Sequence, residues 1–521
     1  MNSIDALLKE NFNSRDIKIV LVTTAIISLL LSLSQVLSDL VIDSDGIFYL
    51  SIAAKIQSGD WQAAAKQYNW LFFPALIAQL STLTSLSIEH AAYLINAVFT
   101  AITCSAFVLL TIEFGAKNKG TLWFASLIIL CFPNLNEYRN MIMRDHGYWA
   151  FYLLSCYFFI RAYQHASVKT LLLLLASLVL ASLFRIEGIA LTLALPAIAI
   201  LHRTTSFKAK HITIQVVTVA LVALLIYIIF NAGYIDGLSK VSQIERAIGA
   251  PFAKLEAFTD TTTSYLNQLD HKGFSSDYAP AVLGLTFLLI LSTEILGALS
   301  PLYATALIIS FIKSNAFKSS PLFRPWIYLI LINIVILSGF LISKFFLAGR
   351  YPIALALTLL TPLPSLAYSC YQAFREKKLN KTQLRILSIT IVLFVILSLD
   401  GVISTGASKT YLKDAGEWII QSKQSKEVRL FTNHKLVSFY ADSQSRKRIK
   451  ELNFDNILVR IENDQLRRFN ILAIQVSRKK PTQKQALFDA LGSKPIKTFK
   501  NKKGDAVYIF EAPWQDVSSR L

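Results

Sequence analysis

The sequence is short of charged residues. Only 16% of its 521 residues are Asp, Glu, Lys or Arg, whereas 54% are hydrophobic, including 34 Phe; soluble domains carry roughly 25% charged residues. A soluble core cannot bury so much apolar surface, but a bilayer can, because each helical span takes roughly 20 apolar residues. The deficit of charge excludes an ordinary soluble protein and predicts an integral membrane protein.

Several chemistry-bearing motifs are also missing. The four cysteines fall in or beside apolar runs and form neither a CxxC pair nor a Cys/His cluster, so no structural zinc site is indicated. The chain has no Walker A or GxGxxG loop and no GxSxG or HExxH motif. The sequence therefore signals neither nucleotide binding nor the common hydrolase chemistries.

Positive charge is abundant and unevenly placed. The net charge is +19, and basic residues gather in every second connecting loop, as at Lys117 and Lys119 or at Lys377 and Lys378. Basic loops of membrane proteins stay in the cytoplasm, next to anionic lipid headgroups. The pattern favours lipid rather than nucleic acid as the partner. It places the N-terminus in the cytoplasm and the C-terminal end on the outer, periplasmic face.

Apolar runs predict about eleven transmembrane helices. Residues 71–88 are apolar too, and we interpret them as a re-entrant or interfacial helix pair within a first outer loop, 42–90. A second long outer loop, 232–279, has apolar residues at helical spacing that indicate an amphipathic interfacial helix. The expected spans lie near 17–41, 91–114, 121–136, 147–163, 169–184, 188–201, 211–231, 280–312, 325–343, 351–372 and 386–402.

The chain divides into two parts on this interpretation. Residues 1–404 form a polytopic α-helical membrane domain, and 405–521 form a small extracytoplasmic α/β domain. The tail has strand-like segments (EVRLFTN and FNILAIQVS), a helix closed by Gly492, and a hairpin that turns at Lys503–Gly504–Asp505.

Asp43–Ser44–Asp45, at the outer end of the first span, is the strongest local feature. Two carboxylates beside a bilayer are costly unless they face water, a cation or a metal. In one interpretation a carboxylate of this motif acts as a general base. Asp43 and Asp45 could then also hold a divalent metal such as Mg²⁺ or Mn²⁺, and the sequence leaves this question open. The other is that they mark the end of a span.

Arginines recur at the other outer span ends. Arg144, Asp145 and His146 follow the third span and offer a phosphate-binding cation with a second acid, or only a salt-bridged loop with a hydrogen-bonded histidine. Arg185 and Glu187 sit between two short apolar runs. Such an Arg either snorkels to the interface or binds a lipid phosphate bidentately.

A similar group of basic and aromatic residues precedes a later expected span. Lys344, Arg350 and Tyr351 precede the tenth expected span. Tyr and Arg often anchor a helix at the interface, and Lys and Arg are also the side chains that bind phosphate. Both interpretations remain open for this junction.

The stretch DLVIDSDGIFYLSIAAKIQSGDW, residues 39–61, resembles the first outer loop of the GT-C superfamily. Lipid A aminoarabinose transferases and protein O-mannosyltransferases belong to this superfamily. Asp45 matches the catalytic Asp of that loop, Tyr49 its Tyr, and Gly59–Asp60–Trp61 the end of its helix. Gly46 stands where the family usually has Glu. Arg144, Arg185 and Arg350 resemble the family's outer-face arginines more loosely.

The resemblance implies a GT-C-like fold and an inverting glycosyltransferase of a bacterial cytoplasmic membrane. The implied donor is a polyprenyl-phosphate sugar, and the acceptor is a glycolipid, a glycan or a protein. Asp45 would be the general base, with Asp43 and Asp145 as further acids. The donor phosphate would be held by Arg185, Arg350, Arg144 and Lys344. Further residues expected in the site are Tyr49, His146, Glu187 and Tyr351.

Three other classes would also explain a polytopic chain. A transporter or flippase predicts inverted repeats and charges near the middle of the membrane, whereas these charges lie at span ends. An O-antigen ligase or polymerase would place its catalytic residues in a large late outer loop. A non-catalytic scaffold would only display the C-terminal domain.

Overall fold

The chain folds into two compact units, a helical unit of residues 1–35, 52–139 and 143–403, and a sheet unit of residues 36–51, 140–142 and 404–521. The boundary crosses α2 (Ser14–Ser38) near its end and α3 (Ser44–Gln57), so both helices have residues in each unit. The computed structural model describes residues 11–38, 41–165, 167–201, 241–269, 277–313, 320–402, 409–422, 428–441, 454–463, 465–466 and 469–511.

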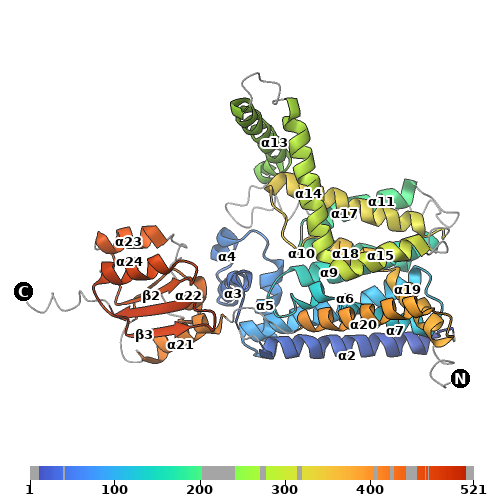
Figure 1. Cartoon of the computed structure of the whole chain (residues 1–521), viewed down its shortest axis with the longest axis horizontal. Helices are drawn as coiled ribbons and strands as arrows, with labels where there is room; N and C mark the ends of the chain where they lie inside the picture. The colour runs from blue at the N-terminus through green and yellow to red at the C-terminus, as the bar shows by residue number, and fades with distance from the viewer. Residues whose placement is uncertain are drawn as a thin grey trace, which may run out of the picture. The chain divides into compact units, whose positions relative to one another are not determined.

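The helical unit is built around α9, which packs against both α6 and α10. Polar residues start several of these helices, because their side chains accept the first free backbone N–H groups: Ser87 accepts from His90, and Asn118 from Thr121. The helices run in the order α2 (Ser14–Ser38), α3, α4 (Trp61–Gln67), α5 (Phe72–Thr84), α6 (Ile88–Glu113), α7 (Lys119–Leu130), α8 (Pro133–Asn136), α9 (Asp145–Gln164), α10 (Val168–Phe184), α11 (Glu187–Leu201), α13 (Val241–Leu269), α14 (Ala279–Leu299), α15 (Pro301–Lys313), α17 (Phe323–Lys344), α18 (Ile353–Leu359), α19 (Leu363–Arg375) and α20 (Lys381–Asp400) (Figure 1).

Five described helices are long and apolar enough to cross a membrane, or six if the pair α18 and α19, bent by 42°, counts as one span. Five shorter apolar helices accompany them. The expectation of about eleven spans is therefore not confirmed, and the run near 211–231 lies outside the described residues. The five long helices are α2, α6, α14, α17 and α20.

The expected span 280–312 is two helices rather than one. α14 ends at Leu299, and α15 begins at Pro301. Ser300 between them has a left-handed φ of 59°, and Pro301 has no N–H to continue the helix and disfavours a helical residue before it. This break divides the expected span.

The exposed side of helix α2 is apolar, whereas the side that packs against the rest of the protein carries small polar residues. Its buried side chains include Thr24, Ser28 and Ser32, whereas Leu33 and Leu37 are 55% and 65% exposed. Thr24 Oγ1 lies 2.7 Å from Ser126 Oγ of α7. Small polar residues that join helices beneath an apolar outer surface are typical of membrane bundles.

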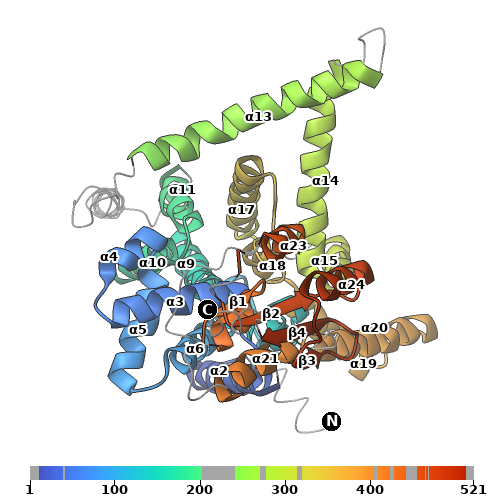
Figure 2. The same cartoon turned by 90° about the vertical axis from the view of Figure 1, so that its left-hand side faces the viewer.

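Helix α13 corresponds to the amphipathic segment expected in 232–279. It packs against α14 and α17 and is drawn in full length in Figure 2. The Phe258 ring lies 5.2 Å from the ring of Phe345. The side chains of the first part of this helix, 241–252, lie outside the described residues.

The sheet unit has one four-stranded sheet, in the order β1-β2-β4-β3. β1 (Leu430–Thr432) runs parallel to β2 (Ile471–Val476), and β4 (Ala506–Glu511) lies antiparallel to β2 and to β3 (Lys497–Lys500). Besides the end of α2 and the start of α3, the described part of this unit contains the helices α21 (Thr410–Ser422), α22 (Lys435–Tyr440), α23 (Phe454–Glu462) and α24 (Pro481–Leu491).

Alternation along the strands gives this sheet an apolar layer on each face. Ile471 and Ala473 of β2 pack with α21 and α22 on one face, and Leu472 and Ile474 pack with α23 and α24 on the other. Val41, which follows α2, is buried in the first of these layers, and the Ile42 N–H donates to Tyr440 Oη at 3.0 Å. The start of the segment 42–90, which was expected to be a first outer loop, is therefore part of the sheet unit.

Candidate active site

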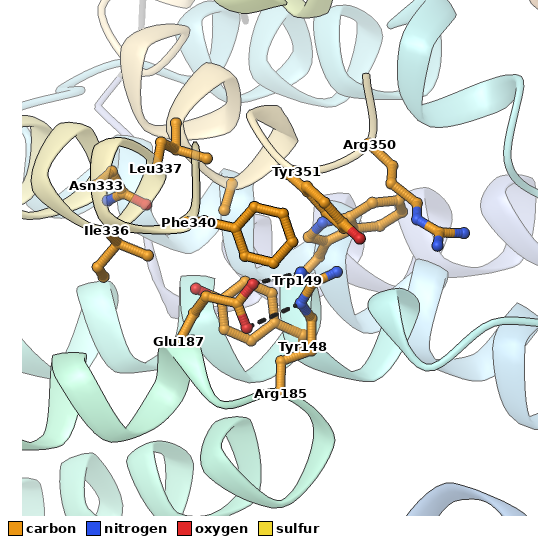
Figure 3. Close-up of a pocket in the computed structure, with 11 residues that line it drawn as sticks. Tyr148, Trp149, Arg185, Glu187, Asn333, Ile336, Leu337, Phe340, Arg350 and Tyr351 are labelled. Atoms are coloured by element: carbon orange, nitrogen blue, oxygen red, sulfur yellow. Dashed lines mark hydrogen bonds and ion pairs between the residues drawn. The ribbon is translucent and has the colours of Figure 1, made fainter. Parts of the chain in front are cut away.

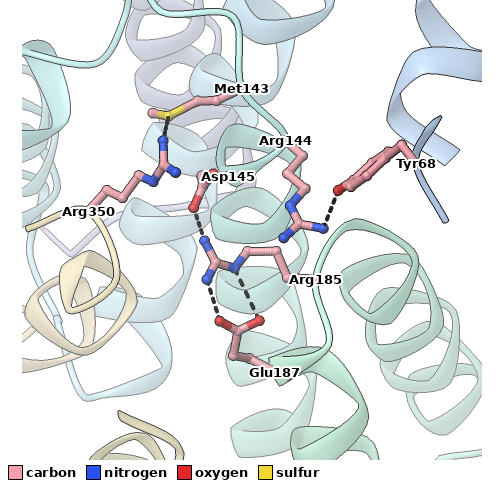
Figure 4. Close-up of polar contacts among 7 residues, drawn as sticks. All are labelled: Tyr68, Met143, Arg144, Asp145, Arg185, Glu187 and Arg350. Atoms are coloured by element: carbon pink, nitrogen blue, oxygen red, sulfur yellow. Dashed lines mark hydrogen bonds and ion pairs between the residues drawn. The ribbon is translucent and has the colours of Figure 1, made fainter. Parts of the chain in front are cut away.

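A buried arginine joined to two carboxylates lies at the centre of the helical unit. Arg185 follows α10, Asp145 begins α9 and Glu187 begins α11, so three helix ends converge there. The Arg185 guanidinium forms ion pairs with Asp145 and with Glu187, and its Nε donates to Glu187 Oε2 at 3.1 Å (Figure 4). Arg185 is only 4% exposed. Its donors are thus directed at protein carboxylates rather than at solvent.

A narrow cleft opens beside this cluster, with a volume of ≈ 10 Å³, or room for about one water molecule. The Arg185 Cζ lies 4.4 Å from the centre of the Tyr351 ring, a cation–π contact (Figure 3). The cleft thus presents aromatic faces and fixed charges. It is lined by Tyr148, Trp149, Arg185, Glu187, Asn333, Ile336, Leu337, Phe340, Arg350, Tyr351 and Ala354.

Two further arginines flank the cluster. Arg144 is half-buried, and its Nη1 donates to Tyr68 Oη at 2.7 Å. Arg350 is half-buried, and its Nη1 lies 3.9 Å from Met143 Sδ. Asp145 lies within electrostatic range of both. The cluster thus holds three guanidinium groups, of which Arg144 and Arg350 are only half-buried and can attract an anion.

The remaining residues expected in this part of the site are placed differently. His146 is fully buried, with Nδ1 3.0 Å from Thr100 Oγ1 and Nε2 3.0 Å from the Tyr138 carbonyl oxygen. These contacts favour the reading of a hydrogen-bonded partner. Lys344 ends α17, is exposed, and does not line the cleft.

Asp43 has a structural task in the sheet unit. Its Oδ2 accepts from the Gly46 N–H at 3.0 Å, and its Oδ1 accepts from the Ile142 N–H at 2.9 Å. Burial raises the pKa of Asp43, and these two hydrogen bonds oppose that rise. The carboxylate caps the first turn of α3 and ties it to the segment 140–142.

Asp45 and Tyr49 lie on α3, within its part of the sheet unit. Asp45 is in the first turn and half-buried, and Tyr49 is 7% exposed. A carboxylate in the first turn of a helix is stabilised by the helix dipole. No group of three His, Cys, Asp or Glu that could hold a metal ion occurs among the described residues.

Gly46 has no room for a side chain, which explains why Glu does not stand there. A Cβ at this position would lie 2.8 Å from both Asp43 Oδ1 and Ile42 Cγ2, and 3.1 Å from Ile142 Cβ. Contacts under 3.0 Å require the neighbours to move. The close approach that lets Asp43 bridge the two segments thus requires glycine.

We expect Gly46→Ala to lower stability by about 1–3 kcal/mol, the range of an overpacked site. The measurement is thermal unfolding of the purified protein in detergent. Gly284→Ala is the matched control, because a Cβ on Gly284 meets nothing within 4 Å. If Gly46→Ala were as stable as Gly284→Ala, a side chain at position 46 would not be excluded by crowding.

Two polar residues of the helical unit were missed by sequence reasoning. Arg139 is 1% exposed and donates to Ser28 and Ser32 of α2 and to Asn136. The sequence feature that could have revealed this contact is the four-residue spacing of Ser28 and Ser32 in an apolar helix. Glu294 lies within α14 and is half-buried. Its signal was a single carboxylate in an apolar run, a default functional candidate in membrane proteins.

No protein-family model matches the sequence, and no curated protein is significantly similar to it. Among solved structures, the Archaeoglobus fulgidus oligosaccharyltransferase in complex with Zn and sulfate matches with a TM-score of 0.53 and 15% identity, covering 93% of this chain and 73% of that one. This likeness shows that the chain shares the fold of that oligosaccharyltransferase, which agrees with the expected GT-C-like fold.

Two other solved structures are similar to a lesser degree. The apo form of the same oligosaccharyltransferase has a TM-score of 0.49 at 16% identity, with coverages of 84% and 62%. Mycobacterial arabinofuranosyltransferase AftD has a TM-score of 0.47 at 15% identity, with coverages of 94% and 41%. The chain thus spans less than two thirds of these two neighbours.

Proposed function

We propose that the protein is an inverting glycosyltransferase that moves a sugar from a polyprenyl-phosphate donor to an acceptor at the outer face of a bacterial cytoplasmic membrane. The observation that carries the proposal is the arginine cluster beside an aromatic cleft, in a chain whose fold is similar to that of an oligosaccharyltransferase. The acceptor class is a glycolipid, a glycan or a protein.

The chemistry needs few groups. A sugar on a lipid phosphate already has a good leaving group, so no general acid is required, unlike ordinary glycoside hydrolysis. Asp45 takes the proton of the acceptor hydroxyl as the oxygen attacks the anomeric carbon. The bond from that carbon to the phosphate oxygen breaks, and the displacement inverts the anomeric centre.

Arg350 and Arg144 hold the departing phosphate in this scheme, because both are only half-buried and stand beside the cluster. Arg185 has a different part. Its guanidinium is already engaged by Asp145 and Glu187. It therefore fixes the end of α9 that presents Arg144, and it packs on the Tyr351 ring next to Arg350. We accordingly assign it as a positioning residue rather than a phosphate ligand.

The activity is tested by mass spectrometry of surface glycans and lipid-linked sugars in cells with and without the gene. A glycosyltransferase predicts that one modified glycan disappears and that its lipid-linked sugar donor accumulates. Unchanged profiles of both pools would contradict the proposal. If the protein were a flippase, cells without the gene would instead keep the donor on the cytoplasmic side of the membrane.

The orientation gives a separate prediction. A reporter that is active only in the periplasm should be on when it is fused after Val402 and off when it is fused near Lys378. The reason is that Arg375, Lys377 and Lys378 form a basic loop, which is expected to stay in the cytoplasm. The reverse pattern would invert the topology and place Asp45 on the cytoplasmic side.

A further inference from the structure

Three separate elements meet around Gly349, next to the cleft. Tyr138 comes from the segment between α8 and α9, Glu294 from α14, and Gly349 from the segment before α18. A Cβ on Gly349 would lie 3.6 Å from Tyr138 Oη and 3.8 Å from Glu294 Oε2. Any ligand atom at that point would therefore touch both oxygens. Gly349 itself is exposed, so the point is open to a ligand.

The two oxygens are available for such a ligand. Within the part of the chain that the structure describes, neither Tyr138 Oη nor the Glu294 carboxylate makes a hydrogen bond or an ion pair. A carboxylate within an apolar helix of a membrane protein is a functional candidate by default. Burial and the neighbouring Glu137 raise the pKa of Tyr138 to about 12, which keeps the phenol protonated as a donor.

The chemistry of this space suits a polyhydroxylated ring. A carboxylate accepts hydrogen bonds from sugar hydroxyls, and a phenol both donates and accepts. Gly349 also directly precedes Arg350, which lines the cleft. A phosphate held by Arg350 would carry the sugar on one of its oxygens, and Gly349 is the neighbouring residue in the chain.

We infer that Tyr138, Glu294 and Gly349 form the subsite that binds the sugar ring of the lipid-phosphate donor. This inference rests on the proposed glycosyl transfer and adds to it the residues that recognise the sugar. Glu294 accepts from ring hydroxyls, Tyr138 bonds another hydroxyl, and the absence of a side chain on Gly349 leaves space for the ring.

The test compares the binding of farnesyl phosphate with that of farnesyl phosphate carrying glucose, mannose or arabinofuranose, using the full chain in detergent. Wild type should bind at least one sugar-bearing compound more tightly than farnesyl phosphate. Glu294→Gln should weaken that compound roughly tenfold or more, the worth of a charged hydrogen bond. Binding of farnesyl phosphate should stay unchanged.

Gly349→Ala is the second variant, because it fills the space with one methyl group. The new Cβ would sit at ordinary contact distances, so folding should be preserved while the sugar is excluded. Gly339→Ala is its control, since a Cβ there meets nothing within 4 Å. We expect the sugar preference to be lost in Gly349→Ala and kept in Gly339→Ala.

The outcomes separate the two proposals. If both Glu294→Gln and Gly349→Ala keep the wild-type preference for the sugar-bearing compound, the subsite is wrong although glycosyl transfer stands. A parallel loss of farnesyl phosphate binding would assign these residues to the phosphate or to the fold, which also overturns the subsite. Wild type with no preference for any of the sugars would contradict the proposed function itself.

Discussion

Asp45→Asn should abolish sugar transfer while the protein stays folded in the membrane. The amide keeps the size of the side chain and most of its hydrogen bonds, but it cannot take the proton of the acceptor hydroxyl. Removal of a general base costs about 10²–10⁴-fold in rate. The measurement is transfer of labelled sugar from lipid-phosphate donor to acceptor in membranes that contain equal amounts of each variant.

Asp43→Asn is the matched control for this change, because the two carboxylates are separated by one residue. Asp43 accepts from two backbone N–H groups, and the amide retains an acceptor oxygen for one of them. We expect it to lower stability more than it lowers transfer. If Asp45→Asn kept near-normal transfer while Asp145→Asn lost it, the base would have to be reassigned to Asp145; full activity of both variants would contradict the glycosyltransferase.

That the protein is a polytopic membrane protein could be predicted from the sequence, because apolar runs and basic loops depend on local composition alone. Several helices predicted from apolar runs are present, such as α2, α6, α17 and α20. The interruption at Ser300 was also legible, since Pro301 stands in the run. Counting this run as a single span gave too much weight to its length and too little to the proline.

The roles of single polar residues could not be predicted from the sequence, because they depend on partners far along the chain. Asp43 is bound by the N–H of Ile142, 99 positions later, and that contact is what excludes a side chain at Gly46. Arg185 was expected as a phosphate ligand, but Asp145 from another helix end occupies its guanidinium. Composition at span ends predicts that such residues matter, and only the packing shows to what each is bonded.

The partners of Arg185 reverse the expected effect of its removal. Arg185→Ala should destabilise the helical unit rather than weaken donor binding in an intact protein. Asp145 and Glu187 are both largely buried, with side chains 3% and 10% exposed. Breaking a buried pair by removing one partner typically costs about 3–5 kcal/mol. Thermal unfolding in detergent measures this loss, with Arg350→Ala as the comparison at a half-buried arginine.

A triple variant separates the loss of the charge partner from the loss of packing. Asp145→Asn, Arg185→Met and Glu187→Gln together remove every charge of the ion-paired cluster and keep the approximate size of each side chain. Replacing a whole buried ionic group by neutral residues is often nearly neutral for stability, so the triple variant should be more stable than Arg185→Ala alone. Should Arg185→Ala instead unfold like wild type and lose only donor affinity, Arg185 would be a phosphate ligand after all, and its ion pairs would have to open when the donor binds.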